Sequence, residues 1–131
     1  MVPLICAAVI LSLTTGIALA AGAPKVPKSA KKLTGSEIVA LYDNTWFRFN
    51  NFMKPTTTGT FLVSFTTKTA SGTYVTGKDR GTWIGTVRIK GNQFCRRINK
   101  HKEGCVFLYV DGPSIYEVNG RGVVESLNRK R

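Results

Sequence analysis

Apolar and polar residues alternate along most of the chain from residue 45 onward. In the segment 60–68, Phe61, Val63 and Phe65 fall on one side of the alternation, and most residues on the other side are polar. Successive side chains of a β-strand point to opposite faces, so a period of two is typical of a strand with one buried face. The pattern therefore predicts a β-rich protein.

Seven such segments are predicted as strands, each bounded by turn-forming residues. They are residues 45–52, 60–68, 73–76, 82–90, 93–99, 105–110 and 114–118, with residues 123–124 as a further short strand. The segments 56–59, 70–72 and 77–81 are predicted as turns because they are rich in glycine and small polar residues. Short strands at a spacing of about ten residues predict an antiparallel meander.

A short helix is predicted in front of the first strand. Thr34 and Glu37 have the spacing of a capping box, and Leu33 and Ile38 flank them at the positions of a hydrophobic staple. A helix of about two turns is not stable alone, so it must pack against the sheet. We therefore predict a mainly β fold with one short N-terminal helix. Its antiparallel meander forms a small curled sheet or a partly closed barrel with one disulfide, and the helix closes one end.

The first 20 residues have the pattern of a secretory signal peptide. Residues 1–22 contain no charged side chain, and their apolar run ends in Ala18-Leu19-Ala20, the small-x-small pattern of a cleavage site. An uncleaved membrane anchor is the competing interpretation, but an apolar run of about 18 residues is at the short end for a span. We predict cleavage, a periplasmic or secreted location, and no stable membrane span in the processed protein.

The remaining chain divides into three parts. Residues 21–32 hold four lysines and no acidic side chain, and they are predicted to form a basic flexible leader. This leader is either an anion-binding arm or a solvated linker. Residues 33–126 are predicted to form a single β-rich domain, and residues 127–131 a basic tail.

The chain is strongly basic, with 19 lysines and arginines against 7 aspartates and glutamates and a formal net charge of +12. A charge of this size draws a protein toward anionic partners, or it serves only to keep the protein soluble. Nucleic acid would suit the charge, but the predicted export argues against it as the natural partner. An anionic polymer of the cell envelope or an acidic protein is the expected partner.

Cys95 and Cys105 are predicted to form a disulfide. They lie on two neighbouring predicted strands, at equal distances from Lys100. Directly opposed residues of an antiparallel pair have Cα atoms about 4.5–5.5 Å apart, a separation that a disulfide can span. A metal site or a reactive thiol pair is the alternative. The nine intervening residues, the single histidine and the lack of a CxxC motif argue against both.

The segment between the cysteines carries four cations, Arg96, Arg97, Lys100 and Lys102, which are the candidate anion-binding residues. A disulfide would hold this loop rigid and lower the entropy lost on binding. The alternative is an exposed hairpin that is only solvated, since charged runs usually face water. His101, the only histidine, is interpreted as a solvated loop residue.

Several of these residues occur together in one arrangement. The chain contains, in this order, Gly81-Thr82-Trp83, a strand, Phe94-Cys95-Arg96, Asn99-Lys100, Lys102-Glu103-Gly104-Cys105 and Tyr109-Val110-Asp111-Gly112. The arrangement resembles a family of short exported alpha-proteobacterial proteins classed as a domain of unknown function. Ile98 departs from the family pattern, which often has tryptophan there, and the insert before the second cysteine is shorter. The resemblance covers about residues 33–120 and implies an exported β-rich domain with paired cysteines, without an activity.

Two functions of different classes fit these observations. The first is a non-enzymatic envelope-interaction module that contacts anionic partners through the basic hairpin loop. The second is a lipocalin-like carrier of a small apolar ligand, for which the strands offer Trp46, Phe47, Phe49, Phe61, Phe65, Trp83 and Phe107. Alternatively, these aromatic residues fill the core, which is the expected state of a barrel this small. No paired carboxylates and no Ser-His-Asp or Cys-His arrangement are visible, so we predict no enzymatic activity, cofactor or metal.

Overall fold

The computed structural model describes residues 22–131. The predicted signal peptide at residues 1–20 lies outside this range, as does the first residue of the predicted leader. The described chain folds into nine strands and one helix. None of its helices is long and apolar enough to cross a membrane.

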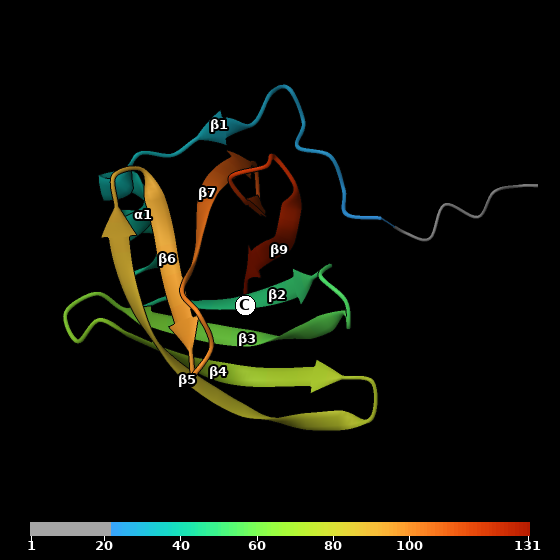
Figure 1. The fold of residues 1–131 in the computed structure, drawn as a ribbon. Helices are drawn as coiled ribbons and strands as arrows, with labels where there is room; N and C mark the ends of the chain where they lie inside the picture. The colour runs from blue at the N-terminus through green and yellow to red at the C-terminus, as the bar shows by residue number, and fades with distance from the viewer. Residues whose placement is uncertain (1–21) are drawn as a thin grey trace, which may run out of the picture.

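Eight of the strands form a closed barrel. The elements are, in chain order, β1 (Lys31–Lys32), α1 (Gly35–Tyr42), β2 (Trp46–Asn51), β3 (Thr57–Ser64), β4 (Thr69–Thr76), β5 (Asp79–Lys90), β6 (Gln93–Ile98), β7 (Gly104–Asp111), β8 (Ser114–Val118) and β9 (Val124–Lys130). From β2 to β9 each strand pairs antiparallel with the next, and β9 pairs back onto β2 (Figure 1). The mainly β meander with one short N-terminal helix is confirmed, and the barrel is fully closed.

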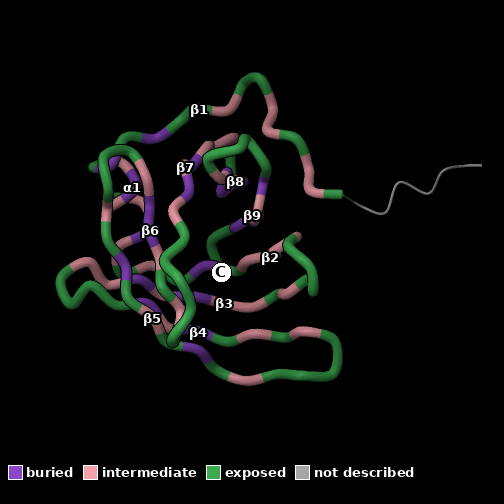
Figure 2. The backbone as a smooth tube through the Cα atoms, viewed as in Figure 1, coloured by how far each residue is buried: buried purple, intermediate pink, exposed green. Residues whose placement is uncertain are grey.

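Burial along the strands follows the predicted period of two. Along β2 to β5, buried positions occur singly and are separated by exposed or partly exposed ones (Figure 2). In β5, Trp83 and Val87 are buried, whereas Ile84 is 69% exposed on the outer face. One face of each strand therefore points into the barrel and the other points outward.

The short strand β1 pairs with β7 beyond the point where the β6–β7 pairing stops, near the start of β6. β6 pairs with β7 only as far as Phe94 and Val106, and beyond that point Lys31 and Lys32 pair with Val110 and Tyr109. The predicted leader at residues 21–32 therefore needs correction, because its last two residues form a strand on the barrel. The predicted leader lacks apolar periodicity, and pairing through the backbone does not require any.

Helix α1 closes one end of the barrel. The predicted capping box is present, with the Glu37 amide donating to Thr34 Oγ1 at 3.3 Å and the Thr34 amide donating to Glu37 Oε1 at 3.2 Å. The amide of Gly35 donates to Asn92 Oδ1 in the β5–β6 turn at 3.0 Å. After the helix, Asp43 Oδ1 accepts from the Phe65 amide at 2.9 Å. These contacts attach both ends of α1 to the turns at the same end of the barrel.

All three predicted turns lie at least partly inside strands. Residues 57–59 belong to β3, residues 70–72 to β4 and residues 79–81 to β5. A Cβ atom at Gly72 would collide with the carbonyl oxygen of Thr60, and one at Gly59 would collide with the carbonyl oxygen of Thr73. These glycines allow close approach between neighbouring strands, and they do not mark turns.

The predicted basic tail at residues 127–131 is also wrong. Residues 124–130 form β9, which pairs with β2 and β8 and thereby closes the barrel. The inward residues of this strand include Ser126 and Asn128, which are 2% and 0% exposed. Because these inward residues are polar, the alternation of apolar and polar residues did not reveal the strand.

Candidate functional site

The half of the barrel away from α1 contains an open cavity of about 570 Å³. The β6–β7 loop contributes several lining residues and forms one side of the cavity mouth. This loop lies at the opposite end of β6 from the β5–β6 turn that contacts α1 (Figure 1). The apolar part of the wall consists of Phe49, Phe61, Tyr74, Trp83, Phe94, Ile98 and Val106. The polar part includes Arg96, Glu117 and Ser126 inside and His101 and Lys102 at the mouth. The cavity therefore has an aromatic wall and several polar groups.

Aromatic side chains fill the other half of the barrel. Tyr42, the last residue of α1, is fully buried, and its ring centroid lies 5.0 Å from that of Phe47 and 5.2 Å from those of Phe61 and Phe94. Edge-to-face pairs at such distances are favourable. The expectation of a filled interior thus holds for the end that the helix closes, but the open half is hollow.

A buried carboxylate joins the helix to the cavity. Glu117 of β8 is 1% exposed. The Tyr42 hydroxyl donates to its Oε2 at 2.8 Å, and Nη2 of Arg96 donates to its Oε1 at 3.3 Å. A buried carboxylate requires such partners because its desolvation is otherwise too costly. The ion pair therefore lies at the inner end of the cavity, where the packed half begins.

The same network continues to β9. Asn128 Nδ2 donates to the Tyr42 hydroxyl at 2.7 Å, and Ser126 Oγ donates to Asn128 Oδ1 at 2.7 Å. Within residues 22–131, no buried side-chain nitrogen or oxygen lacks a hydrogen-bond partner. Networks satisfied in this way fix the orientation of their members. The network thus connects Arg96 and Glu117 to Tyr42 of α1 and to Ser126 and Asn128 of β9.

The pKa of Tyr42 gives a pH-dependent prediction. Burial, and secondarily the charge of Glu117, raise this pKa well above its ordinary value of 10.0. Above pH about 10 the unfolded chain therefore loses a proton that the folded chain keeps, and stability falls by about 1.4 kcal/mol per pH unit. We expect the free energy of unfolding measured by urea denaturation to fall by about 1.4 kcal/mol more between pH 9 and 11 than it does in a Tyr42→Phe variant. Equal slopes for the two proteins would contradict it.

The structure separates the four predicted anion-binding residues. Arg96 is a strand residue with the same orientation as Phe94 and Ile98, and it lines the cavity with a side chain that is only 20% exposed. It therefore does not belong to the surface loop, which corrects the prediction for this residue. Strand alternation is the physical reason, since the loop begins only after Ile98.

The other three cations remain near the surface. Arg97 and Lys100 surround a shallow hollow together with His101, Lys102 and Glu103. Arg97 Nε donates to the His101 carbonyl at 3.1 Å, which ties the loop to the end of β6. Lys102 and His101 line both this hollow and the mouth of the cavity. The basic loop therefore forms one side of the cavity entrance.

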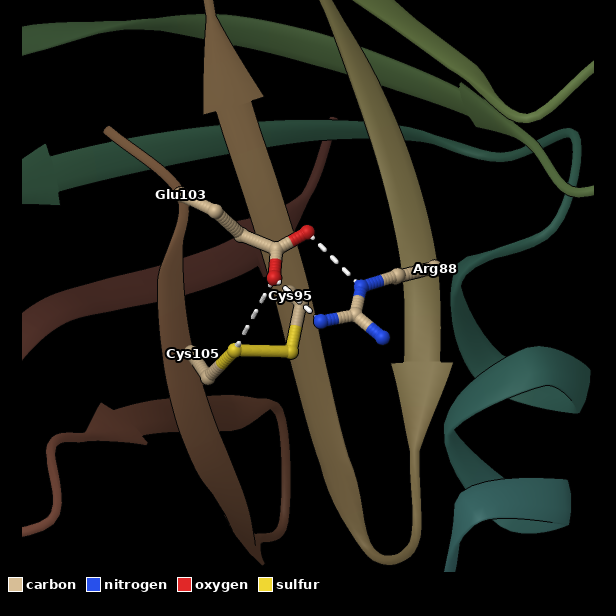
Figure 3. Close-up of a disulfide and its surroundings, with 4 residues drawn as sticks. All are labelled: Arg88, Cys95, Glu103 and Cys105. Carbon is tan, nitrogen blue, oxygen red and sulfur yellow. Dashed lines mark hydrogen bonds and ion pairs between the residues drawn. A yellow bond between two sulfur atoms is a disulfide. The ribbon is translucent and has the colours of Figure 1, made fainter. Parts of the chain in front are cut away.

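The predicted disulfide is confirmed. Cys95 and Cys105 are direct partners in the β6–β7 ladder, with Cα atoms 4.0 Å apart and bonded sulfurs (Figure 3). Glu103 lies over the bridge and pairs with Arg88 through bonds of 2.6 and 2.8 Å. This arginine holds the pKa of Glu103 below its ordinary value. Donor atoms of Cys95, Glu103 and Cys105 lie within 4.8 Å of one another, but the bonded sulfurs are not available as thiolate ligands.

The sequence analysis missed Tyr42, Glu117, Ser126 and Asn128 as site residues. One signal was available for Glu117, which occupies the same strand face as the buried Ile115 two residues earlier. A charged residue on the buried face of a strand indicates a functional or structural partner inside. The same argument applies to Arg96 between Phe94 and Ile98. No such pattern exists for Tyr42, whose position is that of an ordinary core residue.

The site combines an enclosed apolar wall with a few fixed polar groups, which is the usual composition of a small-molecule binding site. Its chemistry suits binding through shape, apolar contact and one buried charge pair. Comparison of the chain with protein-family models, with curated proteins and with solved structures found no match in any of the three.

Proposed function

We propose that this protein is a lipocalin-like carrier that binds a small, largely apolar molecule inside its barrel. The observation that carries the proposal is the open cavity of about 570 Å³ within a closed eight-stranded barrel. Eight strands leave room for side chains or for one small ligand, and ligand sites typically have volumes of about 300–1,000 Å³. The aromatic wall supplies most of the apolar contact.

The construction of the barrel supports a preformed site. Every strand from β2 to β9 is paired on both sides, and the disulfide joins β6 to β7 close to the mouth. A rigid cavity lowers the entropy lost when a ligand binds. Binding therefore requires no rearrangement of the walls.

A neutral fluorescent probe tests this proposal. We expect N-phenylnaphthylamine to bind and become strongly fluorescent, and we expect Ile98→Trp to weaken binding about tenfold or more by filling part of the cavity. Ile98 lines the cavity, whereas Ile84 is 69% exposed on the outer face, so Ile84→Trp is the matched control. The proposal fails if the probe does not bind or if both variants bind it equally. If the probe binds as expected, native mass spectrometry of protein purified from its host would identify the natural ligand.

A second candidate function rests on the basic loop. We propose that Arg97, Lys100 and Lys102 also contact an anionic envelope polymer or an acidic protein, which the net charge of +12 supports. Attraction of this kind weakens as salt screens the charges. Heparin affinity should fall with salt and be abolished in the variant Arg97→Glu/Lys100→Glu/Lys102→Glu. Heparin binding that is insensitive to salt and to the charge reversal would exclude this function.

We also propose that the protein acts outside the cytoplasm. A disulfide is typical of oxidising compartments, and the Cys95–Cys105 bridge supports this location. The intact mass of protein purified from its host tests the proposal. We expect a mass lacking about the first 20 residues and a gain of two hydrogen atoms on reduction. A full-length mass would contradict cleavage.

A further inference from the structure

We infer that the ligand carries an acidic group, such as a carboxylate or sulfonate, which binds to Arg96 inside the cavity. The inference rests on the proposed carrier function and specifies the chemistry of its ligand. Three features of the site carry it: the free donors of Arg96, the burial of Glu117, and the lysine at the mouth.

Arg96 has hydrogen-bonding capacity that the protein does not use. Its guanidinium has five N–H donors, and within residues 22–131 it makes one hydrogen bond, from Nη2 to Glu117. Its side chain lines the cavity and remains 20% exposed, so the other donors are accessible from inside. A guanidinium presents paired donors that match the two oxygens of a carboxylate or sulfonate.

Glu117 acts as a positioning residue for this arginine. One of its oxygens accepts from Tyr42 and the other from Arg96, and the residue is 1% exposed. A cationic ligand group would therefore find no accessible oxygen on this carboxylate. The guanidinium carbon also lies 5.7 Å from the centroid of the Phe94 ring, which fixes the arginine from a second side.

Glu125 and Lys102 are the other charged residues of the cavity lining, and their formal charges are opposite. Glu125 Oε1 accepts from Asn119 Nδ2 at 3.3 Å. Lys102 and His101 lie at the mouth, and within residues 22–131 Lys102 forms no ion pair. An acidic ligand therefore passes Lys102 at the entrance and meets Arg96 inside the cavity.

Two probes with the same ring system distinguish this inference from the proposed function. Anilinonaphthalenesulfonate carries a sulfonate, and N-phenylnaphthylamine has no charge. At neutral pH we expect the wild-type protein to bind the charged probe at least about tenfold more tightly than the neutral probe. This ratio corresponds to about 1.4 kcal/mol. In the variant Arg96→Met/Glu117→Gln the ratio of the two affinities should fall to about one. Removing both charges avoids leaving the buried Glu117 without its partner.

The ratio of the two affinities is informative even if the variant is less stable, because a loss of folded protein lowers the apparent affinity for both probes by the same factor. Arg48→Met is the matched control, since Arg48 is exposed on β2, and it should leave the ratio unchanged. Equal affinities in the wild type, or a preference that survives in the double variant, would overturn the inference while the carrier function stands. Failure of the neutral probe to bind would overturn both.

Discussion

Tyr42→Ala is expected to lower the free energy of unfolding by about 3–5 kcal/mol, the usual range for removing a buried aromatic side chain. Tyr42 is fully buried, and its ring packs edge-on against Phe47, Phe61 and Phe94. It is also the residue through which α1 reaches Glu117 and Asn128. Its removal would leave a cavity and break the connection between the helix and the buried network. Urea denaturation followed by circular dichroism measures the loss.

Tyr42→Phe separates packing from hydrogen bonding. Phenylalanine keeps the ring but removes the hydroxyl that donates to Glu117 and accepts from Asn128. Leaving buried polar groups without a partner costs about 1–3 kcal/mol. Tyr109→Phe is the control, because Tyr109 is partly exposed and its hydroxyl has no hydrogen-bond partner within residues 22–131. If the two variants were equally stable, the buried network would contribute nothing beyond packing.

Local signals in the sequence predicted the parts of the fold that depend on near neighbours. The capping box of Thr34 and Glu37 needs only two residues three positions apart, and it marked the start of α1 correctly. The disulfide was predictable for a similar reason, since two strands joined by a short loop place Cys95 opposite Cys105. In both cases the feature can be predicted from the sequence of one element or one hairpin alone.

Features that depend on distant segments were predicted less well. Gly59 and Gly72 were assigned to turns, because glycine is common in turns and their contact across β3 and β4 is not visible locally. The strand β9 was predicted only at its start, residues 123–124, because its inward residues Ser126 and Asn128 are polar partners for a network built by α1 and β8. Their burial follows from the closed barrel, which no local pattern specifies.

The candidate site shows the same difference between features that depend on near neighbours and features that depend on distant segments. Arg96 was recognised as an important cation, but it was assigned to the wrong surface because its charge was given more weight than its position between Phe94 and Ile98. The cavity itself was not predictable, since the number of aromatic residues does not determine whether they fill a barrel or line it. That depends on how Tyr42 gathers three phenylalanines at one end.

Removing the disulfide with Cys95→Ala/Cys105→Ala is expected to lower the free energy of unfolding by about 2.8 kcal/mol in the chain-entropy model. The bridge joins residues separated by ten positions, and the reduced loop gains freedom mainly in the unfolded chain. The control is Arg88→Ala, which removes the exposed ion pair with Glu103 over the same bridge. That variant should lose much less stability than the double cysteine variant, because the pair is exposed to solvent.

The position of the bridge predicts a local effect as well. β6 and β7 share only three paired positions, and these lie next to the loop that forms the mouth of the cavity. Without the disulfide, amide hydrogen exchange should accelerate first in the paired residues of β6 and β7, because few ladder hydrogen bonds join these two strands. Affinity for the neutral probe should fall in the same variant, since the wall is no longer preorganised. If exchange accelerated equally across all strands, the bridge would stabilise the barrel as a whole and would have no special role at the cavity entrance.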